Sequence, residues 1–162
     1  MWGRSKKSML EAGSPAAEFQ LKSLKGTNES LDALLAKGPA LLAFFKIGCP
    51  VCQLTFPFLD RLSASSSIQV VGISQDDAPS TEGFNQRFGV TFPTLLDSAK
   101  DGYQASNAYG ITTVPSLFLV EPDGRISTAF NGFSKRDLEA LATRGGIQIF
   151  RPDENVPEWK AG

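Results

Sequence analysis

Two cysteines lie three positions apart, shortly after a stretch in which every residue is apolar. The stretch is Ala40–Phe45, and the motif that follows it, Cys49-Pro50-Val51-Cys52, contains both cysteines of the chain. A continuous apolar run of this length predicts a strand buried on both faces, and proline suits the first turn of a helix. Free amides at a helix start stabilise a thiolate, so a pair at this spacing can open and close a disulfide with little backbone movement. The motif therefore predicts a dithiol redox site.

The composition is that of an ordinary globular domain. The chain has 162 residues, of which 41% are apolar and 20% are charged, and its net charge is −1. One domain with a substantial core is therefore expected. Because charges of one sign do not gather in long runs, we expect neither a nucleic-acid partner nor a membrane partner.

Histidine is absent from the sequence. Its absence excludes Ser-His-Asp and Cys-His catalysis and every metal site built on histidine. A structural zinc site needs four ligands, whereas this chain offers two thiols, so we expect no metal and no cofactor. Any chemistry is left to thiols, carboxylates, hydroxyls, lysines or the backbone.

The first residues, Met1–Glu11, include basic side chains, but no apolar stretch follows them. This is not the pattern of a secretory signal peptide. We therefore expect a cytoplasmic protein if the chain is full length, and an extracytoplasmic protein if a leader has been removed.

The apolar patterns predict an alternation of strands and helices. Strands are expected at residues 18–21, 40–45, 68–73, 94–96, 116–120 and 125–130. Helices are expected around residues 31–35, from 50 to 62 with a kink at Pro57, and at 79–88, 101–109 and 135–144. This order predicts an α/β fold whose parallel sheet has right-handed crossovers and an antiparallel hairpin at one side. The dithiol then lies at the carboxyl end of a central strand, where such sheets place their sites.

The motifs follow the order seen in a known family. The chain resembles bacterial thioredoxin-fold proteins of the TlpA/ResA-like group, on the border with the AhpC/TSA peroxiredoxins, over residues 15–142. The motifs that carry the resemblance are Glu18-Phe19-Gln20-Leu21, Leu41–Phe45, Cys49-Pro50-Val51-Cys52 with Phe56-Pro57, Val70–Ser74, Phe92–Asp97, Tyr109-Gly110-Ile111, Val114–Val120 and Asp123–Ile126.

The resemblance implies an α/β thioredoxin fold with a central mixed β-sheet, helices on both faces and an N-terminal extension. It divides the chain into three parts. Residues 1–13 would form a flexible N-terminal arm, residues 14–146 a thioredoxin-like domain, and residues 147–162 a C-terminal tail that packs on the domain or trails from it.

The resemblance also implies a thiol–disulfide oxidoreductase that exchanges its dithiol with protein disulfides, together with an unidentified redox partner. A monomer is expected. Cys49 would attack, Cys52 would resolve the mixed disulfide, and the peptide bond before Pro115 would be cis. The Val114 backbone would then pair with an extended substrate strand. The residues expected to bind substrate are Pro50, Val51, Thr113, Val114 and Pro115.

Several positions near the cysteines differ from the family pattern or add to it. Ala43 and Thr55 stand where relatives often carry acids that move protons for the resolving thiol, and Gly48 replaces an aromatic residue. Lys46 could lower the pKa of Cys49, and Asp76-Asp77 follows a strand end from which it could reach the site.

Other interpretations of the cysteine pair remain open. In a peroxiredoxin-like thiol peroxidase, Cys52 would be the peroxidatic cysteine and Cys49 would replace the usual peroxide-binding threonine. The arginine that this family carries just before residues 116–120 is missing. The chain could also be a non-catalytic thioredoxin-like binding module. A zinc site shared across a dimer and a purely structural disulfide are the remaining alternatives.

Overall fold

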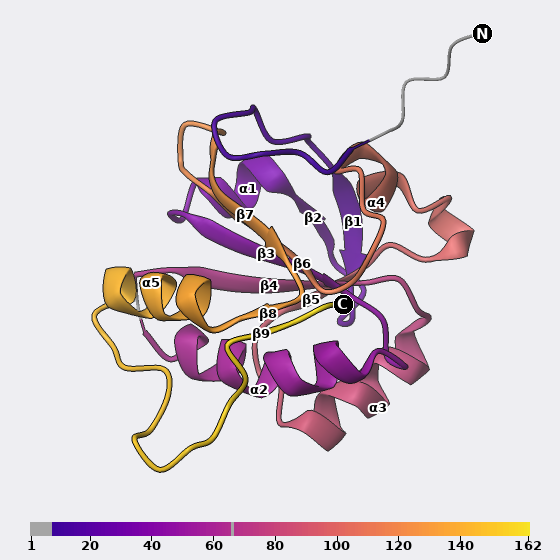
Figure 1. The fold of residues 1–162 in the computed structure, drawn as a ribbon. Helices are drawn as coiled ribbons and strands as arrows, with labels where there is room; N and C mark the ends of the chain where they lie inside the picture. Colours follow the sequence, from indigo (N-terminus) through magenta and orange to yellow (C-terminus); the bar gives the residue numbers. More distant parts are fainter. Residues whose placement is uncertain (1–7, 66) are drawn as a thin grey trace, which may run out of the picture.

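The computed structural model describes residues 8–65 and 67–162. A seven-stranded mixed β-sheet lies at the centre of the molecule (Figure 1). The strand order is β2-β1-β5-β4-β3-β6-β7, and β3, β4 and β5 are parallel while the other neighbours are antiparallel. The strands are β1 (Gln20–Ser23), β2 (Asn28–Ser30), β3 (Ala40–Phe45), β4 (Gln69–Ser74), β5 (Thr94–Leu96), β6 (Ser116–Val120) and β7 (Ile126–Asn131). A short second sheet pairs β8 (Phe133–Ser134) with β9 (Trp159–Lys160).

Helices cover both faces of the large sheet (Figure 1). On one face lie α2 (Pro50–Ser63), α3 (Ala78–Phe88) and α5 (Lys135–Gly145), and on the other lie α1 (Leu31–Leu35) and α4 (Gln104–Ala108). The predicted central mixed sheet flanked by helices is confirmed. Among the helices of the described residues, none has the length and apolar character required to cross a membrane.

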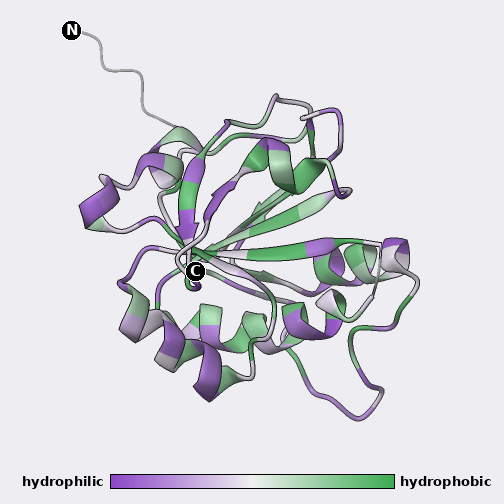
Figure 2. Cartoon of the chain, turned by 180° about the vertical axis from the view of Figure 1, so that it is seen from behind, coloured by the Kyte–Doolittle hydropathy of each residue, from purple (hydrophilic) through white to green (hydrophobic). Residues whose placement is uncertain are grey.

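Strand β3 contributes side chains to two separate cores. Alternate residues of a strand point to opposite faces of its sheet, so a strand covered on both sides must be apolar throughout. Figure 2 shows this distribution, with hydrophobic strands inside and hydrophilic residues on the outer sides of the helices. All residues of β3 are fully buried, with Leu41, Ala43 and Phe45 in the core below α2 and α3, and Ala40, Leu42 and Phe44 in the core below α1 and α4.

Local chemistry fixes the helix boundaries next to the cysteines. Cys49 is the N-cap of α2, and Pro50 occupies the first turn, where a missing N–H costs no hydrogen bond. Asp77 is the N-cap of α3 and accepts the amide of Ser80 at 2.9 Å. Helix α3 ends at Gly89, which adopts a left-handed conformation with φ of 66°.

The helix predicted at residues 101–109 is wrong in its first half. The chain forms a 3₁₀ turn at Ala99–Asp101 and then the separate helix α4. Gly102 and Tyr103 between them have φ values of 66° and 50°, which a right-handed helix cannot contain. The buried Asp97 carboxylate accepts the amides of the first turn of α4 and so fixes its start.

Two smaller differences concern the N-terminal half. The strand expected at residues 18–21 begins at Gln20. It pairs with β2, a strand that the sequence analysis did not predict. Helix α2 continues through Pro57 to Ser63 as one helix, and a kink at this proline stays a prediction.

The beginning of the described chain lies against the domain. The amide of Leu10 donates to the Tyr109 carbonyl at 3.0 Å, and the amide of Gly13 donates to the Ile126 carbonyl at 2.7 Å. The backbone of Ser8 passes so close to Gly110 that a side chain there would collide with it. The predicted arm at residues 1–13 lies partly outside the described residues, and its flexibility stays a prediction.

Phe56 is the central ring of the core between α2 and the sheet, with its ring centre 4.3 Å from that of Phe45. We expect Phe56→Ala to lower the free energy of unfolding by about 3–5 kcal/mol, because the cavity cannot close fully. Urea unfolding measures the loss. Phe88→Ala is the matched control, since Phe88 is only partly buried, and a loss as large as that of Phe56→Ala would contradict this assignment.

Candidate active site

The two cysteines occupy different environments at the start of α2. Cys49 is half-buried and Cys52 is fully buried, and both carry free thiols. The amide of Cys52 donates to the Cys49 sulfur at 3.0 Å, so this sulfur takes the place that a serine or aspartate oxygen fills at other helix starts. The positive end of a 14-residue helix therefore points at Cys49.

A loop from the other half of the chain faces this sulfur. The peptide bond between Val114 and Pro115 is cis, as the resemblance predicted. The Cys49 thiol donates to the Val114 carbonyl oxygen at 3.4 Å. Because β6, which follows this loop, pairs antiparallel with β3, its first residues lie beside the end of the strand that leads to the cysteines. The fold thus joins two segments that are 65 positions apart in the sequence.

The surroundings separate the pKa values of the two thiols. The pKa of Cys49 is lowered to about 7, mainly by the hydrogen bond from the Cys52 thiol. Partial burial raises this pKa and so opposes the shift. The amides of Cys52 and Val51 and the charge of Lys46 lower it further. Burial raises the pKa of Cys52 far above its usual value, and the hydrogen bond to Cys49 acts in the same direction. At neutral pH these surroundings favour the thiolate form of Cys49 and the protonated form of Cys52.

Two side chains hold the loop that precedes Cys49. The Asp76 carboxylate accepts the amide of Ile47 at 2.8 Å, and the Gln53 side-chain amide donates to the Ile47 carbonyl at 3.0 Å. Asp76 follows β4, which is parallel to β3, so the two strands deliver these groups to the same edge of the sheet. The sequence suggested that Asp76 could reach the site, but no signal in the sequence identified Ile47 as its partner.

The other predicted substrate-binding residues surround the sulfur unevenly. Pro50 and Thr113 are exposed, Val51 is half-buried, and Pro115 is buried. The Thr113 carbonyl accepts the Ser116 hydroxyl at 2.7 Å, which holds the loop before β6. The structure thus brings both sides of the predicted site together.

The positions without the family's acids are apolar or already paired. Ala43 is fully buried in the same core as Cys52. Thr55 is also buried, and its hydroxyl donates to the Val51 carbonyl at 2.7 Å. Neither position supplies a carboxylate to the Cys52 thiol. Asp77, which the sequence placed near the site, caps α3 instead.

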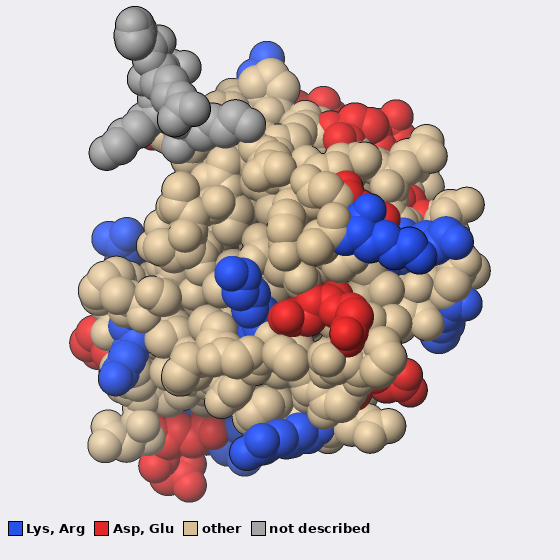
Figure 3. All heavy atoms as spheres, turned by 90° about the vertical axis from the view of Figure 1, so that its right-hand side faces the viewer, with Lys and Arg blue, Asp and Glu red and all other residues tan. Residues whose placement is uncertain are grey.

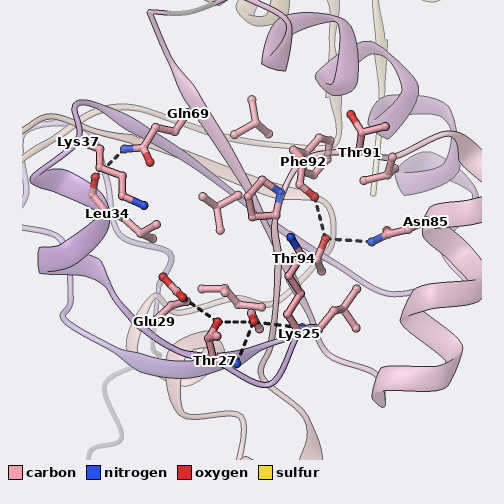
Figure 4. A pocket seen from close by; sticks show the side chains of 17 residues that line it. Lys25, Thr27, Glu29, Leu34, Lys37, Gln69, Asn85, Thr91, Phe92 and Thr94 are labelled. Carbon is pink, nitrogen blue, oxygen red and sulfur yellow. Dashed lines mark hydrogen bonds between the residues drawn. The ribbon is translucent and has the colours of Figure 1, made fainter.

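A hollow of about 430 Å³ lies at the end of the parallel strands that is opposite to the cysteines (Figure 4). Gln69 and Thr94 line it where β4 and β5 begin, and Asn85 reaches it from α3 and donates to the Thr94 hydroxyl at 3.1 Å. Neither cysteine lines this hollow, and neither does the Val114–Pro115 loop. The dithiol chemistry therefore does not extend to it.

Charge is mixed on the face drawn in Figure 3, which is the right-hand side of Figure 1. Basic and acidic residues alternate there among uncharged ones, and neither sign forms a broad patch. Long-range attraction of a strongly charged partner is therefore not a feature of this face.

Comparisons with known proteins agree with this geometry. A sequence model of the AhpC/TSA family matches residues 12–129. The thiol-disulfide oxidoreductase ResA of Geobacillus kaustophilus is 29% identical over an alignment of 140 positions, which covers 83% of this chain and 78% of that protein. The solved structure of dsbF from MTB is 29% identical, with a TM-score of 0.68 over 78% of this chain and 94% of that one.

A further solved structure shows the fold. The thioredoxin domain of a thiol-disulfide oxidoreductase from Bacteroides vulgatus has a TM-score of 0.72 at 22% identity, over 83% of this chain and 97% of that one. The predicted thioredoxin fold is therefore confirmed.

Removal of the Asp76 carboxylate tests its role as a positioning residue. We expect Asp76→Ala to lower the free energy of unfolding by about 1–3 kcal/mol, because the Ile47 amide loses a charged acceptor. The freed loop should also raise the pKa of Cys49, measured from thiolate absorbance. Asp76→Asn, which keeps an acceptor oxygen, should restore most of both properties.

The neighbouring carboxylate provides the control for this change. Asp77→Ala removes the cap of α3 and should lower the free energy of unfolding without moving the pKa of Cys49. Equal pKa values of Cys49 in Asp76→Ala and Asp77→Ala would show that the Ile47 hydrogen bond does not position the cysteine.

Proposed function

The chain belongs to the AhpC/TSA family, and on this premise we propose that it is a thiol–disulfide oxidoreductase whose dithiol is Cys49 and Cys52. One observation carries the proposal. The Cys49 sulfur, with its pKa lowered to about 7, lies at the start of α2 and contacts the Val114 carbonyl of the cis-proline loop. An attacking thiolate and a backbone edge able to hold a peptide thus face each other.

The first step is attack by the Cys49 thiolate on one sulfur of a substrate disulfide. The new Cys49–substrate bond forms as the substrate disulfide breaks, and the other substrate sulfur leaves as a thiolate. A pKa near 7 suits this step, because a thiol with a pKa near the ambient pH combines a large thiolate fraction with good nucleophilicity.

The second step is attack by Cys52 on the Cys49 sulfur. Cys52 lies one helical turn further along α2, and its amide already contacts that sulfur. Its proton passes to the departing thiolate, so the products are the Cys49–Cys52 disulfide, one substrate thiol and one substrate thiolate. Two electrons have moved from the protein to the substrate.

The substrates we propose are protein disulfides or dithiols. Val114 is half-buried at the end of the loop that faces Cys49, and an extended segment that pairs with its backbone would bring a disulfide to the sulfur. Pro50, Val51 and Thr113 would border this segment. We assign this work to a catalytic unit at residues 14–146.

The surroundings of Cys52 argue against a thiol peroxidase. A peroxidatic cysteine must ionise and meet peroxide, whereas Cys52 is fully buried and burial raises its pKa. The lowered pKa of Cys49 favours catalysis over a non-catalytic binding role, because strongly shifted pKa values are typical of catalytic groups.

Several predictions about the cellular context are proposals that rest on the sequence. We propose a monomer that exchanges electrons with a separate redox partner.

Serine variants test the assignment of the two sulfurs. Cys49→Ser should abolish reduction of insulin disulfides, because Cys52 is buried and protonated. Cys52→Ser should accumulate a mixed disulfide at Cys49, detected by mass spectrometry, because the resolving thiol is gone. If Cys49→Ser instead keeps full activity and Cys52→Ser loses it, Cys52 is the attacking cysteine and the peroxiredoxin-like assignment replaces this one.

The pH dependence of alkylation tests the pKa of Cys49. The thiolate is the reactive form, so the rate of Cys49 alkylation should rise with pH and reach half of its plateau at about pH 7. Below that pH the rate should fall by about tenfold per pH unit. A midpoint near the ordinary cysteine value would contradict the lowered pKa of Cys49. Cys49→Ser is the control and should be labelled only slowly.

A further inference from the structure

The tail after α5 is anchored to the domain. Ile149 is buried, and the ring centre of Phe150 lies 4.9 Å from that of Phe58 on α2. Arg61, also on α2, donates to both carboxylate oxygens of Glu154 at 2.6 and 2.7 Å. This pair lowers the pKa of Glu154 to about 2. The tail therefore returns across α2 along a defined path.

Beyond this anchor, the C-terminal segment, residues 159–162, runs toward the candidate site. Its strand β9 pairs antiparallel with β8, with Trp159 opposite Ser134 and Lys160 opposite Phe133. Figure 1 shows the end of the chain at the edge of the sheet where α2 begins. The segment thus has the extended backbone of a bound peptide.

Two glycines allow this segment to lie so close. Gly132 has φ of 74°, and a side chain there would collide with the Lys160 carbonyl. A side chain on Gly162 would collide with the Val114 carbonyl oxygen. Gly132 also donates its amide to the Pro115 carbonyl at 2.8 Å. The contact between the segment and the cis-proline loop therefore requires the absence of side chains at both positions.

The Val114 carbonyl oxygen is contacted from two sides. It accepts the Cys49 thiol at 3.4 Å, and the last residue of the C-terminal segment packs against it. We propose, on the basis of the function proposed above, that the C-terminal segment occupies the place of an extended protein substrate and must leave before such a substrate reaches Val114 and Cys49. The chain thereby regulates access to its own dithiol.

The contacts of the segment suit reversible release. The two residues of β9 are exposed, and Trp159 keeps 59% of its surface accessible. The preceding Glu158 approaches Lys135 at 3.6 Å, but its side chain is 86% exposed, so this pair adds little. The segment is therefore held mainly by backbone contacts, namely the β8–β9 pairing and the Lys135 amide that donates to the Glu158 carbonyl at 3.0 Å. The anchor at Arg61 and Glu154 keeps it near the site when those contacts open.

This arrangement separates substrates by size. Cys49 stays half-buried, not buried, with the segment in place, so a small disulfide can reach its sulfur. A protein disulfide also needs the Val114 backbone, and its apparent affinity falls by the fraction of molecules in which that backbone is free. Displacement of the segment should therefore accelerate reaction with proteins and leave small disulfides unaffected.

Gly162→Val in the full chain tests the proposal, because the added side chain cannot pack against the Val114 carbonyl. The measurement is the rate at which the reduced dithiol is oxidised by insulin and, separately, by oxidised glutathione. We expect roughly a three- to thirtyfold faster reaction with insulin, the range that two cross-strand pairs allow, and an unchanged rate with glutathione.

A matched pair of glycine variants controls for backbone strain. Gly132→Ala and Gly124→Ala both place alanine at a positive φ, but only the former collides with the segment, since the space around Gly124 is open. Gly132→Ala should accelerate the insulin reaction as Gly162→Val does, and Gly124→Ala should not. Equal insulin rates in all variants and the wild type would overturn the regulation and leave the oxidoreductase intact. Failure of both disulfides to react with any variant would overturn the proposed function itself.

Hydrogen exchange gives a readout that does not depend on turnover. In Cys52→Ser joined to insulin through Cys49, the amides of residues 159–162 should exchange faster than in Cys52→Ser alone, because the bound protein displaces the segment. Unchanged or greater protection of these amides in the adduct would overturn the proposal.

Discussion

The hydrogen bond from the Cys52 amide to the Cys49 sulfur is the interaction on which the site depends. It makes one atom both the cap that starts α2 and the candidate nucleophile. The amide therefore fixes the boundary of the helix and assists the Cys52 thiol in stabilising the Cys49 thiolate. The neighbouring groups hold the Cys49 sulfur in place. The loop before Cys49 follows β3 and is held by Asp76, and the Val114 carbonyl lies against the sulfur.

The parts of the molecule that the sequence predicted are those with strong local patterns. The continuous apolar run Ala40–Phe45 identified the central strand, because only a strand covered on both faces needs apolar residues at every position. The Cys-Pro-Val-Cys motif identified the start of α2, since proline and a capping side chain act within one turn. The cis bond at Pro115 followed from the resemblance alone, and the residues around it carry no local signal for it.

What the sequence did not predict depends on backbone conformation or on distant contacts. The sequence pattern predicted one helix at residues 101–109, but the left-handed backbone of Tyr103 interrupts it. This conformation is uncommon for a residue other than glycine, so the sequence did not indicate it. The pairing of Asp76 with Ile47 spans 29 positions and arises only when β3 and β4 lie side by side. Nothing in the sequence distinguishes Gly132 and Gly162 from other glycines. Their role depends on the fold, which places the Lys160 carbonyl oxygen against Gly132 and the Val114 carbonyl oxygen against Gly162.

The side chains of Ala43 and Thr55, which lie near Cys52, offer no base to accept the proton of its thiol. Ala43 presents a methyl group in the core that contains this sulfur, and the Thr55 hydroxyl is committed to the Val51 carbonyl. Once Cys49 has captured a substrate sulfur, release therefore waits for a base that comes with the substrate or from solvent. In the proposed exchange, removal of this proton therefore makes the attack by Cys52 more demanding than the attack by Cys49, whose pKa is lower.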